Sequence, residues 1–296
     1  MQDPSTAPSA TLRAALWMTG AIVSFSSMAV AGREVSFALD TFEIMMYRSL
    51  IGIVIVVLVL VATGKLHQVT RRRLNLQFLR NLVHFTGQNL WFFAVTAIPL
   101  AQVFALEFTS PLWVIVLSPL ILGERLTPVR VLAALLGFAG ILIVARPSAD
   151  TVSIGILAAA SAAVFFALTN MFTKRLTRTE TVGCILFWLT AMQLGFGLIA
   201  AGIDGDIALP DGQTAPWLVV IGLGGLLAHF CITNALAIAP ATVVMPFDFV
   251  RLPTIAVVGM LLYGEPLDLW VFVGAAVIFA ANYLNITVEN RKNRVA

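Results

Sequence analysis

Two acidic residues stand at matching places in a chain that carries very few charges inside its apolar runs. Glu107 and Asp248 lie 141 residues apart, and prolines stand close to each of them. An ionisable group inside a membrane is costly and usually faces other protein groups or a water-filled cavity. A proline breaks the helical hydrogen-bond ladder, and the freed carbonyl is tolerated where a neighbouring helix or cavity water satisfies it. The pattern therefore predicts two broken helices beside a pathway through the protein.

Arg251 follows Asp248 by three residues, so the two side chains share one face of a helix. One interpretation is a structural ion pair that neutralises both charges, and the other is that both groups line the pathway. Glu107 is the alternative partner for Arg251. We favour the pathway for all three residues, because the acids recur at the same place in two copies of the sequence.

A polar stripe marks the segment before Glu107. Asn81, His84, Gln88 and Trp91 are spaced by three or four residues, which places them on one helix face. Such a face turns away from lipid, and we expect it to line a cavity, although hydrogen bonding between helices is an alternative for each residue. His84 could titrate near neutral pH, which leaves proton coupling open, but a neutral histidine with satisfied hydrogen bonds is the simpler interpretation.

Aromatic residues accompany the polar ones. Trp91 and Phe108, together with Phe104 and Trp113, would form the wall of a pocket for an apolar or aromatic group, or would pack in the core. The resulting set of predicted substrate-binding residues is Asn81, His84, Gln88, Trp91, Glu107, Phe108, Asp248 and Arg251.

The composition is that of a membrane protein. Of 296 residues, 59% are hydrophobic and 11% are charged, with mean hydropathy +0.95; soluble domains carry about 25% charged residues. Apolar runs of about 20 residues recur along the chain, which predicts an all-α protein with ten transmembrane helices. We place these helices near residues 12–31, 42–63, 77–97, 101–122, 128–145, 154–172, 182–202, 216–237, 241–262 and 267–287.

Lysine and arginine set the predicted orientation. With a cytoplasmic N-terminus, fourteen of these residues fall on the cytoplasmic side and only Arg33 and Arg146 fall outside. Cytoplasmic loops carry such an excess, so both termini are predicted to be cytoplasmic. The basic residues are thus explained by membrane topology, and nucleic acid is not an expected partner.

The chain repeats itself at an offset of 141 residues. Pro99 matches Pro240, and Gly123-Glu124 matches Gly264-Glu265. We divide the chain into a tail (1–11), two repeats (12–147 and 148–287) and a second tail (288–296). Five spans per repeat is an odd number, so the second repeat would enter the membrane upside down.

Motifs for other chemistry do not occur. The chain contains no Walker sequence, dinucleotide fingerprint, zinc motif or nucleophile elbow. We therefore expect no cofactor, no metal and no enzymatic activity, and a gradient rather than nucleotide hydrolysis as the energy source. Cys184 and Cys231 lie in apolar runs and are expected to be buried hydrophobes.

The segment from Pro99 to Leu126, with its Gly-Glu turn, and its copy from Pro240 to Leu267 resemble the EamA-type group of the drug/metabolite transporter superfamily. The resemblance covers nearly the whole chain. It implies a basket in which spans one, three, four, six, eight and nine surround a central cavity. It assigns Glu124 and Glu265 to turns rather than to substrate. Members of the superfamily carry amino acids, purines, riboflavin, S-adenosylmethionine and drugs.

The expected function is secondary transport of a small molecule across the inner (plasma) membrane, in which the chain is a multi-pass protein. The first expectation is an exporter of amino acids, including aromatic ones. The alternative is an importer of a vitamin or cofactor such as riboflavin or S-adenosylmethionine. An intramembrane enzyme or a scaffold without transport activity is a third class, and the lack of a converging catalytic set opposes the enzyme.

Overall fold

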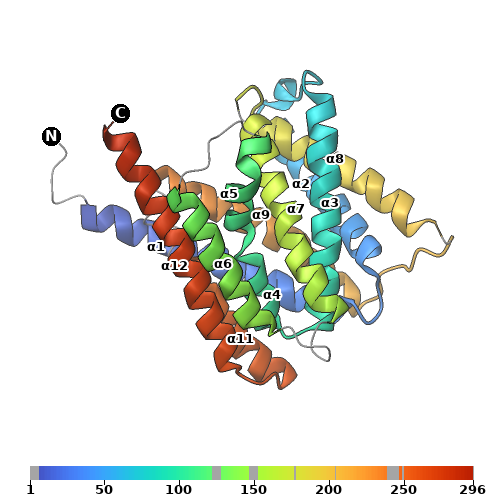
Figure 1. Ribbon diagram of the computed structural model, residues 1–296. Coiled ribbons are helices and arrows are strands. Elements are labelled where there is room, and N and C mark those ends of the chain that lie inside the picture. The colour runs from blue at the N-terminus through green and yellow to red at the C-terminus, as the bar shows by residue number, and fades with distance from the viewer. Residues whose placement is uncertain are drawn as a thin grey trace.

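The computed structural model describes residues 7–121, 128–146, 153–176, 178–203, 205–238, 247–248 and 250–295. Within these ranges every regular element is helical (Figure 1). The helices are α1 (Ala7–Val35), α2 (Thr41–Ala62), the short 3₁₀ helix η1 (Leu66–Gln68), α3 (Leu74–Ala97), α4 (Leu100–Glu107), α5 (Ser110–Ile121), α6 (Pro128–Ala145), α7 (Ile154–Leu176), α8 (Val182–Ala201), α9 (Thr214–Ile238), α11 (Arg251–Tyr263) and α12 (Leu269–Val295).

Among the residues that the structure describes, five segments are long and apolar enough to cross a membrane. They are Leu12–Val35, Thr41–Ala62, Leu100–Leu117, Ile154–Thr173 and Val182–Ala201. Four shorter apolar helices lie in α6, α9, α11 and α12. Helix α3 belongs to neither group, because its polar stripe lowers its hydropathy. The count of ten spans and the cytoplasmic termini stay predictions.

Lipid-facing surface is recognisable on α2. Leu50, Val54, Leu58 and Val61 are large, exposed hydrophobic residues at helical spacing. The opposite face of α2 buries Ile44, among others. A helix that is apolar on both its buried and exposed faces fits a bilayer rather than water.

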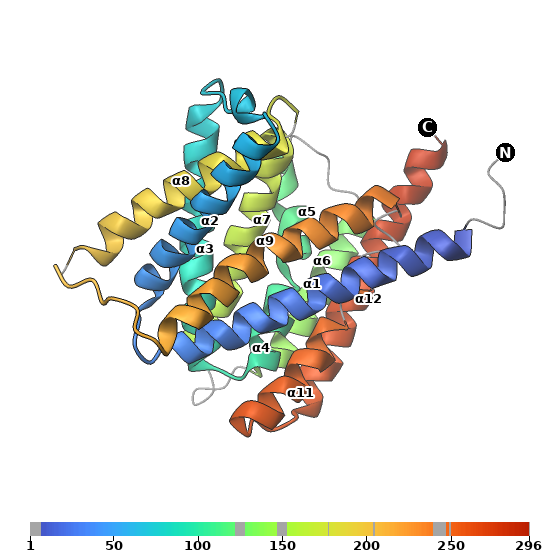
Figure 2. The same ribbon diagram turned by 180° about the vertical axis from the view of Figure 1, so that it is seen from behind.

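Helix packing pairs one half of the chain with the other. Helix α1 packs along α9, and α3 packs along α7; Figure 2 shows α1 and α9 side by side. The α1–α9 contact and the α3–α7 contact are equivalent in the repeat, because the 141-residue offset relates α1 to α7 and α3 to α9. The other main contacts, α2 with α8 and α6 with α12, join helices that correspond to each other. The two halves therefore share a single packed structure.

Close approach of α6 and α12 depends on two glycines. A Cβ atom added to Gly140 would lie 2.9 Å from the carbonyl oxygen of Gly274, and one added to Gly274 would lie 2.8 Å from that of Gly140. Membrane helices associate through small residues that allow backbones to approach in this way. The packing accounts for both glycines without a functional role.

The break predicted beside Glu107 is present. The expected span 101–122 is two helices, because α4 ends at Glu107 and α5 begins at Ser110. Pro111 has no N–H to donate to the carbonyl of Glu107, four residues earlier, and the neighbouring carbonyl of Phe108 accepts a hydrogen bond from Asn282 Nδ2 at 3.1 Å. In the second repeat α11 begins three residues after Asp248, while residues 239–246 and 249 lie outside the described ranges.

One end of the helix bundle is held by Arg33, at the end of α1. Its guanidinium forms an ion pair with Glu265, and it also donates to the carbonyls of Val95 (2.6 Å) and Ile98 (2.7 Å). Glu265 in turn accepts a hydrogen bond from the Leu100 amide at 2.9 Å. Glu265 follows Gly264, whose φ of +64° closes α11 in a left-handed turn. The Gly-Glu turn therefore does more than end a helix, because it connects α11 to α1, α3 and α4.

The Arg33–Glu265 pair supplies a prediction about stability. Glu265→Gln should lower the free energy of unfolding by about 3–5 kcal/mol, since it leaves a buried guanidinium without its counter-charge. Asp268→Asn is the matched control, because its partner Arg146 is 48% exposed and such pairs contribute about 0–1 kcal/mol. The measurement is thermal unfolding in detergent, and equal effects of the two substitutions would contradict a structural role for the Arg33–Glu265 pair.

The topology supplies a second prediction. Single cysteines at Arg72 and Gln213, both exposed, are separated by five predicted spans. An impermeant maleimide applied to intact cells should label Gln213→Cys, while Arg72→Cys should react only after the membrane is opened. Labelling of both positions from one side would contradict the odd number of spans per repeat.

Candidate functional site

A cavity of about 250 Å³ lies where α1, α3, α4, α5, α7 and α11 meet. This volume is close to the lower end of the range for small-molecule sites, about 300–1,000 Å³. Seven of the eight predicted site residues line it, namely His84, Gln88, Trp91, Glu107, Phe108, Asp248 and Arg251. The structure thus brings together side chains from both halves of the chain.

Asn81 is the exception and corrects the expectation for the polar stripe. It is fully buried, and its Nδ2 donates to the carbonyl of Trp188 at 3.1 Å and contacts Met192 Sδ at 3.2 Å, both on α8. Helical spacing places Asn81 on the same broad face as His84, but α8 packs against that part of the face. Its oxygen accepts from Arg80, which does line the cavity.

Arg251 joins the two acids that the repeat relates. Its Nη2 atom lies 3.2 Å from Glu107 Oε1 and 3.2 Å from Asp248 Oδ2. Trp91 Nε1 donates to the other oxygen of Glu107 at 2.8 Å. Asp248 and Arg251 therefore form an ion pair and also line the cavity, which agrees with either interpretation of their spacing.

Three phenyl rings surround the same guanidinium. The Cζ atom of Arg251 lies 4.7 Å from the ring centroid of Phe25, 5.0 Å from that of Phe104 and 4.9 Å from that of Phe108. Cations within about 6 Å of a ring face are attracted by its quadrupole. All three rings belong to the first half, whereas Arg251 belongs to the second, so the contact also joins the halves.

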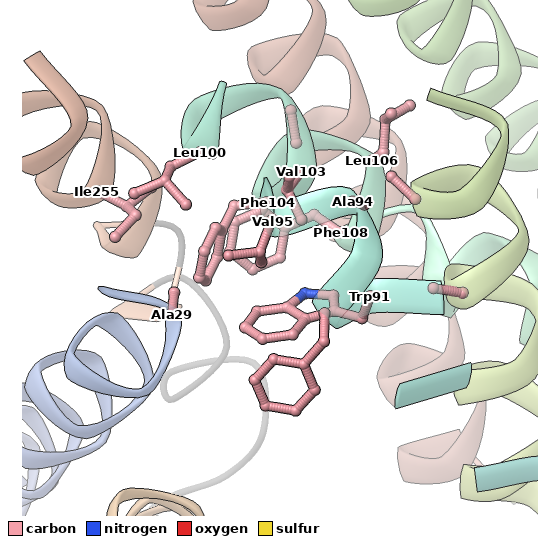
Figure 3. Packing of buried hydrophobic residues seen from close by; sticks show 14 of the residues in the cluster. Ala29, Trp91, Ala94, Val95, Leu100, Val103, Phe104, Leu106, Phe108 and Ile255 are labelled. Atoms are coloured by element: carbon pink, nitrogen blue, oxygen red, sulfur yellow. The ribbon is translucent and has the colours of Figure 1, made fainter. Parts of the chain in front are cut away.

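Figure 3 shows the packed cluster that adjoins these groups, with α1, α3, α4 and α11 contributing side chains. Ala29, Val95, Leu100 and Ile255 are fully buried there. This cluster lies between the cavity and the Arg33–Glu265 pair along α1 and α3. The protein is therefore closed at the Arg33 end of the cavity.

The repeat offset identifies cavity residues that sequence reasoning did not select. Four pairs of residues 141 positions apart line the cavity together, namely Phe25 with Phe166, Met28 with Thr169, Glu107 with Asp248, and Ser110 with Arg251. The match between Phe25 and Phe166 was visible in the sequence, but their place in the cavity was not. Extending the offset argument from the acids to the aromatic residues would have found them.

One arginine of α3 was also missed. Arg80 is among the fourteen basic residues predicted to lie on the cytoplasmic side, yet it is buried and lines the cavity. Arg48, on α2, donates from Nη1 to Gln88 Oε1. Glu43, in contrast, has a structural role at the start of α2, where it completes a capping box with Asp40 and accepts from the Ala208 amide at 2.6 Å.

Residues 12–146 and 153–287 each match the EamA-like transporter family. The chain belongs to this family. Membership and the names of its relatives identify a membrane transporter of small molecules rather than an enzyme. The two matches occupy successive stretches of the chain, in agreement with the internal repeat.

Several EamA-type relatives are named for what they carry. A riboflavin transporter of Vibrio cholerae serotype O1 is 31% identical over 290 residues, which cover 96% of both chains. A riboflavin transporter of Brucella anthropi is 32% identical over 75% of this chain and 79% of its own length. An S-adenosylmethionine uptake transporter of Rickettsia felis is 24% identical over 93% of this chain and 92% of its own.

A solved crystal structure also resembles this protein, with a TM-score of 0.63 at 19% sequence identity, covering 94% of this chain and 98% of that one. At this identity the likeness establishes the fold alone.

The charged cluster supplies a prediction. Arg251→Ala should leave Glu107 and Asp248 facing each other without a cation, and breaking a buried pair costs about 3–5 kcal/mol. Adding Glu107→Gln should restore part of that stability, because it removes one of the two charges. Thermal unfolding in detergent of both variants and of Glu107→Gln alone gives the coupling energy. A coupling energy near zero would show that Arg251 and Glu107 do not interact.

Proposed function

We propose that this protein is a secondary transporter that carries riboflavin, or a flavin of the same ring type, into the cell across the inner membrane. The observation that carries the proposal is an aromatic-walled cavity between the halves of an EamA-type chain. Phe25, Trp91, Phe108 and Phe166 line that cavity, and flat aromatic ligands gain binding energy from such rings. The two riboflavin transporters described above cover most of this chain, which supports the same substrate.

The first expectation, amino acid export, receives less support. The relatives described above are named for riboflavin and S-adenosylmethionine, in agreement with the alternative expectation. The aromatic side chains that suggested an aromatic amino acid as substrate can equally contact a ligand with a larger ring system. Amino acids therefore enter the proposal as a competing substrate class in its test.

Transport in this proposal follows from contacts between the halves. The Arg33 end is closed by the Arg33–Glu265 pair and the packed cluster, while Pro111 and Asn170, which also line the cavity, are exposed. Because the main helix contacts each join one half to the other, a rocking of the halves would exchange which end is closed.

The energy source in this proposal is an ion gradient. Glu107 and Asp248 share one guanidinium, so the cluster carries an excess acid that a proton can neutralise. Uptake of a proton by this cluster would weaken its hold on Arg251 and link substrate movement to the proton gradient. Proton coupling is therefore the expectation for the assay below.

The prediction concerns flux in proteoliposomes that contain the purified protein. Labelled riboflavin should accumulate faster when a pH gradient is applied, and labelled phenylalanine should not. Phe166→Ala should raise the KM for riboflavin by roughly fivefold, because an aromatic pair contributes about 0.5–1.5 kcal/mol. Phe93→Ala is the control, since Phe93 is 40% exposed on α3 and does not line the cavity. Phenylalanine flux without riboflavin flux would reverse the choice of substrate.

A further inference from the structure

The cavity has two chemically different ends. At one end Glu107 and Asp248 share Arg251, so acidic groups outnumber the cation. At the other end Arg80 lines the cavity, and within the described part of the chain it makes no ion pair. Arg80 lies eleven positions along α3 from Trp91, the hydrogen-bond partner of Glu107, which is about 16 Å along the helix axis.

Arg80 is held in place by groups that carry no charge. Its Nε donates to Thr173 Oγ1 at 3.1 Å, and its Nη1 donates to Asn81 Oδ1 at 2.7 Å. Asn81 cannot turn away, because its Nδ2 is engaged by the carbonyl of Trp188. No residue of the described ranges accepts a hydrogen bond from Arg80 Nη2. The guanidinium is thus oriented by Asn81 while one of its nitrogens is left to the cavity.

Arg80 differs from the basic residues that only mark the cytoplasmic side. Arg71, Arg72 and Arg73 are exposed, as expected of loop residues that attract anionic lipid, whereas Arg80 is only 7% exposed. A buried guanidinium without a carboxylate is costly. Because Arg80 lies on the cavity wall, an electron-rich group of a bound ligand would compensate its charge.

Gln88 adds a second donor on the same wall. Its Oε1 accepts from Arg48, so its Nε2 is the atom that remains for a ligand. At the acidic end, Asp248 Oδ1 is buried and has no hydrogen-bond partner in the described structure. The α3 wall therefore offers donors, and the Asp248 end offers an acceptor.

We propose that Arg80, positioned by Asn81, binds the electron-rich edge of the substrate, and that hydroxyl groups at the substrate's other end donate to the acidic cluster. For a flavin, the edge is the pair of ring carbonyls and the hydroxyls are those of the ribityl chain. The assignment of a flavin rests on the proposed function; the attraction of Arg80 for an acceptor group does not. Arg80 then sets the orientation of the substrate in the cavity.

The first arm of the test measures binding by the quenching of flavin fluorescence on the purified protein. Arg80→Gln should raise the Kd for riboflavin by roughly tenfold, as expected for loss of a hydrogen bond to a charged group. The Kd for lumichrome, which keeps the ring carbonyls and lacks the ribityl chain, should rise by the same factor. Arg72→Gln removes the same charge outside the cavity and is the matched control. A rise in the Kd for riboflavin with no rise in the Kd for lumichrome would place Arg80 at the ribityl chain and overturn the proposed orientation.

The second arm needs no substrate. In a chain with Cys184 and Cys231 replaced by alanine, Asn170→Cys places a thiol at the cavity rim. An anionic methanethiosulfonate should react faster than a cationic one, and Arg80→Gln should lower that rate ratio by roughly tenfold, the lower end of what charge-lined clefts do to rates. Arg80→Lys should keep the ratio of anionic to cationic reaction rates, because it keeps the positive charge. It should still bind flavin as weakly as Arg80→Gln does, because an ammonium lacks the planar fork of donors.

The two arms separate the two proposals. Suppose that the ratio of anionic to cationic reaction rates falls in Arg80→Gln, but that the unmodified protein binds neither riboflavin nor lumichrome. The flavin assignment then fails, while the role of Arg80 in attracting electron-rich groups stands. If the ratio is the same in Arg80→Gln and Arg72→Gln, Arg80 does not act on the cavity and the inference is overturned. Unchanged flavin binding in Arg80→Gln overturns it as well.

Discussion

The structure depends on one guanidinium that the two halves share. Arg251 comes from the second half, while Glu107 and the three rings around its guanidinium come from the first. A charge buried at membrane depth is tolerated only when its surroundings compensate for lost water. Here the compensation comes from two acids and three aromatic faces, so any movement of one half against the other changes the environment of Arg251 directly.

This arrangement connects packing to transport. The cavity residues of α1, α3 and α7 lie on helices that pack across the repeat, α1 with α9 and α3 with α7. The Arg33–Glu265 pair holds the same halves together at one end. A rearrangement that opens the Arg33 end therefore breaks a buried ion pair, and a compensating set of contacts is required elsewhere. A chain built from two inverted repeats supplies these compensating contacts within one fold, because each half can adopt the arrangement of the other.

The chemistry of the cavity is asymmetric even though its framework is repeated. The acids and Phe25 with Phe166 recur in both halves, whereas Arg80, His84 and Gln88 have Ile221, Gly225 and His229 at the matching positions. In the proposed function the repeated framework serves the movement of the halves, and in the further proposal the unmatched residues on α3 distinguish the two ends of a bound molecule. A substrate with different ends fits this division better than a symmetric one.

The sequence by itself determined the helical class and the repeat, and it predicted that Glu107, Asp248 and Arg251 belong to one site. Hydropathy and proline chemistry act locally, and the repeat emerges when the sequence is compared with itself, so these features can be predicted without knowledge of helix packing. It also predicted the broken helix beside Glu107, since Pro111 removes a donor wherever the helix lies. The family resemblance correctly identified the EamA-type group.

Only the tertiary structure decided which face of each helix meets which neighbour. Asn81 shares its spacing with His84 and Gln88, yet α8 covers it and turns it into a support for Arg80. Arg80 itself looked like one more cytoplasmic cation, because a basic residue near a helix end has the same local sequence whether it meets lipid headgroups or a cavity. Helical periodicity gives a direction around the helix axis, and the packing of distant segments determines what lies in that direction.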